Sequence, residues 1–295
     1  DQKYRAKFNM KGKYRIVPLD IGEYDGVKVL DYEEVCVENI DMSFQDYSDL
    51  RQFYFVIENV FNNQLFEVFF RYATTLGVSK FDYLLRIFNN ISKAPKKIVE
   101  IFDAFAEETK SELWDSDSEL VQYYKKDENY QKLIRGDAGG NLIYKYKAMG
   151  LATAINEWAQ YLSNLLEDIV NEKREKSAEQ PFENNKSKKE IYNLTKYHKN
   201  RMWKILDNTS NEQNVTMDSE YDFLSWMKEE EPQPLSSYHL NNPVRYFFRY
   251  SEEQKRERDD QFRRYGTDVN GVSRIAGRVR IENWLRNVGI NSNFV

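Results

Sequence analysis

Few side chains in this sequence are nitrogen or sulfur ligands for a metal, and its many carboxylates lie mostly in solvated runs. It contains two histidines, His198 and His239, and one cysteine, Cys36. A structural zinc site needs four ligands, most often cysteine and histidine, and neither an HExxH nor a CxxC spacing occurs. We therefore predict no metal-binding residue. For His198 we expect a surface or partly buried position in a helix, and for His239 a position in a loop.

Covalent catalysis needs a serine, cysteine or lysine that is activated by a neighbouring base. Cys36 lies between Val35 and Val37 in a run typical of a strand, which favours a buried, inert thiol over a nucleophile. The glycine-rich loop from Gly136 to Gly140 lacks the GK[ST] sequence of a phosphate-binding loop, so we interpret it as a connection between helices. We predict no catalytic residue and no cofactor-binding residue in this chain.

Aromatic rings are the most distinctive feature of the composition, with 21 Tyr and 18 Phe among 295 residues. Rings that carry a polar group suit a pocket of mixed apolar and polar character. We single out five as candidates for lining a substrate pocket: Tyr144, Tyr146, Trp158, Tyr246 and Tyr250. For each of them taken singly, packing in the core is the alternative interpretation.

The C-terminal residues 241–295 are locally basic. They contain 11 Lys and Arg against 7 Asp and Glu, which gives a local charge of +4 by subtraction. Arginine interleaved with aromatic residues, as in RYFFRY, can pair with phosphates or stack on bases. The acids among these arginines can also neutralise them through pairs four residues apart. We favour a helix laced with salt bridges, and we keep a face that binds RNA or protein as the alternative.

Charge and hydropathy limit the class of protein. The formal net charge of -5 disfavours binding of nucleic acid by the whole chain. No apolar run approaches the roughly 20 residues of a membrane span, and one cysteine cannot form an internal disulfide. We therefore expect a soluble, cytoplasmic protein. A start at Asp1 rather than methionine is compatible with a piece of a longer polypeptide.

The elements that would position these residues are mainly helices. We predict a mainly α fold, an irregular helical bundle with a small N-terminal β-hairpin or sheet fragment. The hairpin spans Tyr14 to Val37, with a tight turn at Asp25 and Gly26, two residues that tolerate positive φ. Four segments are expected: a β-rich junction at 1–42, a helical core at 43–172, a linker or exposed loop at 173–190, and a C-terminal helical part at 191–295 that packs on the core.

Within those segments, three elements can be predicted with defined bounds. Apolar residues at helical spacing predict one long central helix from Asn141 to Val170. The run from Pro243 to Tyr250 favours a strand, and Ser251 then caps a charged helix. A last helix is expected over Val272 to Val288.

Four stretches carry a resemblance to a known family. YRIVPLDIGEYDG and DYEEVCVENIDMSFQDYSDLRQFYFVIENVFN, and further on GNLIYKYKA and YFFRYSEEQKRERDDQFRRYGTD, resemble the region that follows the catalytic barrel in B12-binding radical SAM proteins. The resemblance implies a parent enzyme with a cobalamin-binding domain and a barrel whose CxxxCxxC motif holds a [4Fe–4S] cluster. It implies that this chain is a helical C-terminal accessory domain that covers the active site or selects the substrate.

The chain departs from that family at the residues that do the chemistry. A cluster of this kind needs three cysteine thiolates, and Cys36 is alone. The [4Fe–4S] cluster, SAM and cobalamin therefore belong to the suspected parent protein, and no ligand residue is carried over to this chain. The expected partners are the N-terminal catalytic domains of the same polypeptide, with a small-molecule substrate. A stand-alone helical module that binds protein or RNA is the alternative function.

Overall fold

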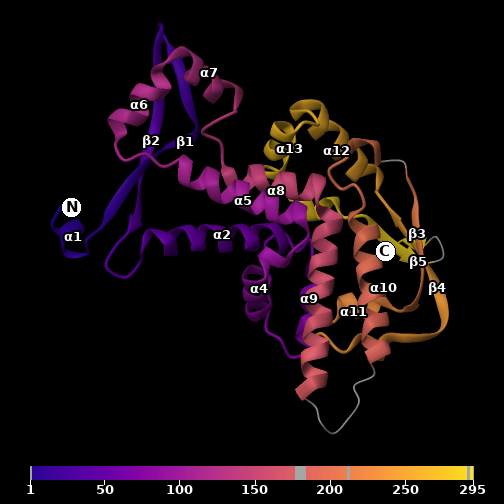
Figure 1. Ribbon diagram of the computed structural model, residues 1–295. Coiled ribbons are helices and arrows are strands. Elements are labelled where there is room, and N and C mark those ends of the chain that lie inside the picture. Colours follow the sequence, from indigo (N-terminus) through magenta and orange to yellow (C-terminus); the bar gives the residue numbers. More distant parts are fainter. Residues whose placement is uncertain (1, 177–183, 211–212, 291–292, 295) are drawn as a thin grey trace. The chain divides into compact units, whose positions relative to one another are not determined.

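The computed structural model describes residues 2–176, 184–210, 213–290 and 293–294, and the fold in them is mainly α (Figure 1). This confirms the predicted fold class, including the N-terminal hairpin. The chain divides into two compact units, residues 1–55 with 100–146 and residues 56–99 with 147–295. These units do not coincide with the four expected segments, because the chain leaves the first unit and later returns to it.

The first unit holds the hairpin and the helices that cover it. Its elements are α1 (Gln2–Lys7), β1 (Lys11–Tyr24), β2 (Val27–Glu38), α6 (Asp117–Lys125) and α7 (Asp127–Arg135), with parts of α2 (Phe44–Val60), α5 (Lys96–Ser111) and α8 (Leu142–Thr153). The turn forms as predicted, because Asp25 and Gly26 take φ values of 51° and 77°, which a two-residue hairpin turn requires. A register shift between Ile16 and Ile21 lies around Pro18, which has no N–H for the ladder.

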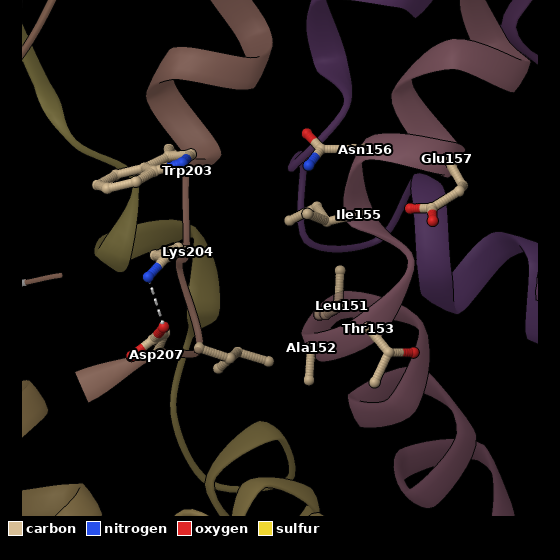
Figure 2. A pocket seen from close by; sticks show the side chains of 10 residues that line it. Leu151, Ala152, Thr153, Ile155, Asn156, Glu157, Trp203, Lys204 and Asp207 are labelled. Carbon is tan, nitrogen blue, oxygen red and sulfur yellow. Dashed lines mark ion pairs between the residues drawn. The ribbon is translucent and has the colours of Figure 1, made fainter. Parts of the chain in front are cut away.

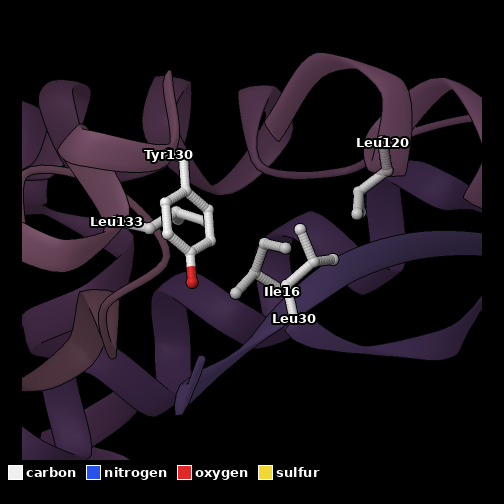
Figure 3. Packing of buried hydrophobic residues seen from close by; sticks show 5 residues of the cluster. All are labelled: Ile16, Leu30, Leu120, Tyr130 and Leu133. Carbon is white, nitrogen blue, oxygen red and sulfur yellow. The ribbon is translucent and has the colours of Figure 1, made fainter. Parts of the chain in front are cut away.

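One face of the hairpin is buried under α6 and α7. Ile16 of β1 and Leu30 of β2 form a core with Leu120, Tyr130 and Leu133 (Figure 3). The phenol of Tyr130 donates a hydrogen bond to the Gly22 carbonyl, which ties α7 to β1. A two-stranded hairpin alone is marginal in water, so the cover by two helices stabilises it.

The second unit contains the long helices and a second sheet. Its helices are α3 (Glu67–Thr75), α4 (Lys80–Asn89), α9 (Ile155–Lys176), α10 (Asn184–Met202), α11 (Phe223–Lys228), α12 (Glu252–Tyr265) and α13 (Val269–Ala276), with the 3-10 turns η1 (Ile91–Lys93), η2 (Asn208–Ser210), η3 (Leu235–Tyr238) and η4 (Ile281–Trp284). Its strands are β3 (Val215–Tyr221), β4 (His239–Arg249), β5 (Asn287–Ile290) and β6 (Asn293–Phe294), in that order in an antiparallel sheet.

Helix α10 lies between another long helix of this unit and its sheet. It packs on α9 and on β3. Toward the sheet, the ring of Tyr197 is stacked on Phe223, with centroids 4.5 Å apart, and meets Phe248 edge-on at 5.5 Å. The core of this unit is therefore built largely from rings, as the composition indicates. Of the expected linker, residues 177–183 lie outside the described residues, while α9 and α10 occupy the rest as far as residue 190.

The expected central helix is two helices, because the chain breaks at Ala154 between α8 and α9. The Thr153 hydroxyl donates a hydrogen bond to the Met149 carbonyl at 2.7 Å, a contact that bends helices. The Thr153 carbonyl also accepts a hydrogen bond from the Lys97 ammonium. No glycine or proline marks this break in the sequence, so helical spacing alone predicted one element.

The predicted C-terminal helix is wrong beyond Ala276. Helix α13 ends there, and the chain then forms η4 and the strand β5, which pairs with β4 through Phe248 and Val288. The predicted strand at 243–250 is confirmed as part of β4, and Ser251 caps α12 in a capping box with Gln254. In the described residues, no helix is long and apolar enough to cross a membrane.

Candidate functional site

A cavity of ≈ 290 Å³ lies in the second unit, where α8 gives way to α9. One wall is the junction itself and the other is the segment that follows α10 (Figure 2). We call it the junction cavity. Its lining residues are Leu151, Ala152, Thr153, Ile155, Asn156, Glu157, Trp203, Lys204, Leu206 and Asp207. The break that the sequence did not reveal thus forms half of the cavity.

The lining combines an apolar floor with polar groups nearer to solvent. Leu151 and Leu206 are buried, whereas Asn156 and Lys204 are exposed. Ligand pockets are usually apolar with a few polar groups that orient the ligand. The junction cavity is more polar than that, because five of its ten lining residues are polar or charged, and its volume is at the small end of the usual range.

Both signs of charge are present along the cavity. The Lys204 ammonium lies 3.2 Å from an Asp207 carboxylate oxygen, and Glu157 on the opposite wall pairs with Lys97 at 3.7 Å. Partial burial would raise the pKa of Asp207, but hydrogen bonds from Thr209 and the ammonium of Lys204 outweigh it and hold that pKa below its usual range. Asp207 is therefore ionised at neutral pH, and it accepts hydrogen bonds and does not donate them.

The backbone of the second wall is strained at one point. Lys204 has a φ of 52°, in the left-handed region that a side chain disfavours by about 1–2 kcal/mol. The segment keeps this conformation through short-range bonds, including Asp207 N–H to the Lys204 carbonyl at 3.0 Å. Strained residues of this kind concentrate at binding sites, so the conformation is consistent with a ligand-binding wall.

Two buried arginines donate hydrogen bonds to backbone carbonyls of this wall and its surroundings. Arg258 of α12 donates to the carbonyls of Ile205 and Asp207, and Arg286 donates to the carbonyls of Gln213 and Trp203. Burial lowers the pKa of both guanidinium groups. Together they fix the carbonyls of the wall. The placement of Trp203 and Asp207 thus depends on residues some fifty to eighty positions further along the chain.

Tyr250 lies between these two arginines. Its ring centroid is 4.3 Å from the guanidinium carbon of Arg258 and 4.4 Å from that of Arg286. A cation close to an aromatic ring is a favourable electrostatic arrangement, stronger where water is excluded. Tyr250, one of the predicted pocket residues, is therefore buried behind the wall and is not among the cavity lining.

The other predicted pocket residues also lie away from the junction cavity. The Tyr246 hydroxyl is buried, donates to the Tyr221 carbonyl at 2.8 Å and accepts from the Phe223 N–H at 3.0 Å. Trp158 is buried on α9 against Tyr161. In the first unit, Tyr146 is buried and donates to Glu108 at 2.6 Å, and Tyr144 is half-buried on α8.

The groups considered for metal or covalent chemistry are dispersed. In the part of the chain that the structure describes, no group of three His, Cys, Asp or Glu could hold a metal ion. His198 is buried on α10, so its expected surface or partly buried position is wrong. His239 is exposed but begins β4 instead of lying in a loop, with Glu220 3.4 Å away. Cys36 lies in β2, as its strand-like surroundings predict, but its side chain is half-buried and not fully buried.

Sequence reasoning missed the residues that line the cavity. The wall that follows α10 lies where the sequence predicts only a polar break, and the bend at Thr153 has no strong marker. The available signal was Asp207, followed two residues later by Thr209. An aspartate whose carboxylate accepts a hydrogen bond from the N–H two residues further on marks a fixed turn.

Comparison with known proteins adds no relative. No protein-family model matches the chain, and neither a curated protein nor a solved structure shows significant similarity to it.

Proposed function

We propose that this chain is a helical accessory domain of a cobalamin-dependent radical SAM enzyme, which binds part of the substrate and performs no chemistry alone. The observation that carries the proposal is the junction cavity. Its lining can bind a small ligand but offers no activated nucleophile. Its one hydroxyl, on Thr153, is already bonded to a backbone carbonyl, and no lining residue is a cysteine or a histidine.

The resemblance in the hairpin and in the C-terminal stretches names the parent family. The residues of this chain do not fit the cluster of that family, because Cys36 is the single thiol and the described residues contain no metal-binding group. No step is derived through the cluster, SAM or cobalamin. The role assigned to this chain is therefore recognition of a substrate.

Recognition follows from the two walls of the cavity. Leu151 and Leu206 would contact an apolar part of the ligand, and the Asn156 amide can both donate and accept a hydrogen bond. The pairs Lys204 with Asp207 and Lys97 with Glu157 balance in charge. The cavity therefore favours a small ligand that is uncharged or zwitterionic over one with a large net charge.

The first test is the coding sequence upstream of Asp1. The proposal expects an open reading frame that continues in that direction and encodes a CxxxCxxC motif. A complete frame without that motif removes the parent enzyme from the proposal.

A second test addresses the cavity in the complete enzyme. Ala152→Trp should fill the cavity and raise the KM for the substrate about tenfold or more, while cleavage of SAM without substrate stays at its wild-type rate. Ala104→Trp is the matched control, since Ala104 is also an exposed helical alanine but lies outside the cavity. A wild-type KM in Ala152→Trp would contradict the role of the cavity.

A further inference from the structure

The C-terminal helices carry exposed arginines whose role is separate from the junction cavity. We call Arg264, Arg274, Arg278 and Arg280 the arginine surface; all four are exposed. The apolar residues of the same segment face inward, because Ile275, Ile281 and Trp284 are fully buried. Packing thus accounts for the apolar side of this segment, whereas the four arginines are exposed to solvent.

The end of α12 and the segment after it share one surface. Helix α13 packs on α12 so closely that a Cβ on Gly271 would lie 2.2 Å from the Tyr265 carbonyl oxygen. The guanidinium carbon of Arg278 lies 5.2 Å from the Tyr265 ring centroid. Arg278 therefore lies beside the end of α12. Arg264 is also there, one residue before Tyr265, the last residue of that helix.

The expected salt bridges form on α12 but do not extend to this surface. Lys255 pairs with Glu252 at 2.7 Å, and Arg263 pairs with Asp260 at 3.0 Å. In the described residues, the four arginines of the surface form no ion pair within 4.0 Å. Asp268 is the single acid in residues 264–280, and it caps α13 by accepting from the Gly271 N–H at 2.9 Å.

The kind of cation also points to a ligand. All four are arginines, and no lysine follows Lys255 in the chain. Arginine binds phosphate through two parallel N–H groups, which lysine cannot do, and its planar group stacks on bases. Arg278 is exposed and its guanidinium lies near the half-buried Tyr265 ring, so this pair offers a platform of planar groups on which a base can stack.

We propose that the arginine surface binds single-stranded nucleic acid, with the arginines on phosphates and Arg278 against a base. The inference does not depend on the proposed function. The net charge of -5 does not exclude it, because charges more than about 8 Å apart across the surface are largely screened at physiological salt. An acidic protein segment would use the charges but would gain nothing from the Arg278 platform, so nucleic acid is favoured.

The test is fluorescence anisotropy of a fluorescein-labelled 20-nucleotide RNA of mixed sequence, titrated with the full chain at 50 and 200 mM NaCl. With three phosphate contacts the logarithm of the affinity should fall with a slope of about -2.1 against log salt, which is about eighteen-fold over this range. The triple variant Arg274→Gln, Arg278→Gln, Arg280→Gln should reduce the slope to about -0.7.

The control is the triple variant Lys186→Gln, Lys188→Gln, Lys196→Gln on α10, whose lysines are also exposed. It removes the same charge elsewhere and should keep the wild-type slope. Circular dichroism checks that both variants are folded. Absence of binding, an equal loss in both variants, or equally tight binding of poly-L-glutamate would each overturn the proposal.

Discussion

At the scale of single residues, several groups that could do chemistry are held in the interior of the second unit. The buried guanidinium of Arg258, with Arg286, fixes backbone carbonyls, and the Tyr246 hydroxyl bonds to backbone on both sides. The Nε2 of His198, by contrast, has no hydrogen-bond partner in the described residues. Its ring lies 4.8 Å from that of Phe66 and 4.9 Å from that of Phe69.

The stability of the protein should depend on pH through His198. Burial, with the nearby charges of Arg201 and Lys199, lowers its pKa from 6.5 to about 3. The unfolded state therefore binds a proton below pH 6.5 that the folded state does not bind. The free energy of unfolding should fall by about 2 kcal/mol between pH 6.5 and pH 5 from this residue, with no contribution above pH 6.5.

Urea unfolding at pH 7 and pH 5 measures this dependence. His198→Phe should remove about 2 kcal/mol of the acid-induced loss. An unchanged loss in His198→Phe would mean that other groups cause it.

At the scale of elements, the hairpin was predictable because its turn is encoded in two adjacent residues. Asp25 and Gly26 both take the positive φ that the sequence suggests, and nothing lies within 4 Å of the Cβ position on Gly26. The turn therefore depends on the backbone conformation of Gly26 and not on its small size.

Gly26→Ala should destabilise the protein by about 1 kcal/mol, because alanine disfavours the left-handed conformation. Gly140→Ala is the matched control, since its Cβ position is also open but its φ is not positive. Thermal unfolding of the two variants measures the difference. Equal melting temperatures would show that the turn relaxes to another type.

Other elements could not be predicted, for reasons that differ in each case. The strand β3 has buried residues at alternate positions, Met217, Ser219 and Tyr221, but Ser219 hides the apolar pattern. The strand β5 follows a run of helix-compatible residues and forms because it pairs with β4. At the break between α8 and α9, the Thr153 carbonyl accepts a hydrogen bond from Lys97, which lies far away in the sequence. At β5 and at this break, the structure includes a partner that the local sequence does not contain.

At the scale of the whole molecule, each of the two units has a core of its own. The first unit contains the buried cluster of Ile16, Leu30, Leu120, Tyr130 and Leu133, and all five belong to that unit. Proteins open locally in cooperative segments of this kind. A defect in the cluster should therefore be confined to the elements that form it.

Leu120→Ala, at a fully buried position, should cost about 3 kcal/mol and speed hydrogen exchange in β1, β2, α6 and α7. Amide protection in α9 and α10 should stay within error of the wild type. Leu50→Ala, at a position that is 57% exposed in the same unit, should change neither. Equal loss of protection in α9 and α10 would show that the chain opens as one cooperative body.

The single thiol of the chain can report how often the hairpin opens. Cys36 faces Gly12 across the β1–β2 ladder and is half-buried, with its sulfur 3.5 Å from the Glu38 carbonyl oxygen. A maleimide dye can attach at this one sulfur without any engineered site. Its rate of attachment, followed below the urea concentration that unfolds the protein, would report how often the two strands part.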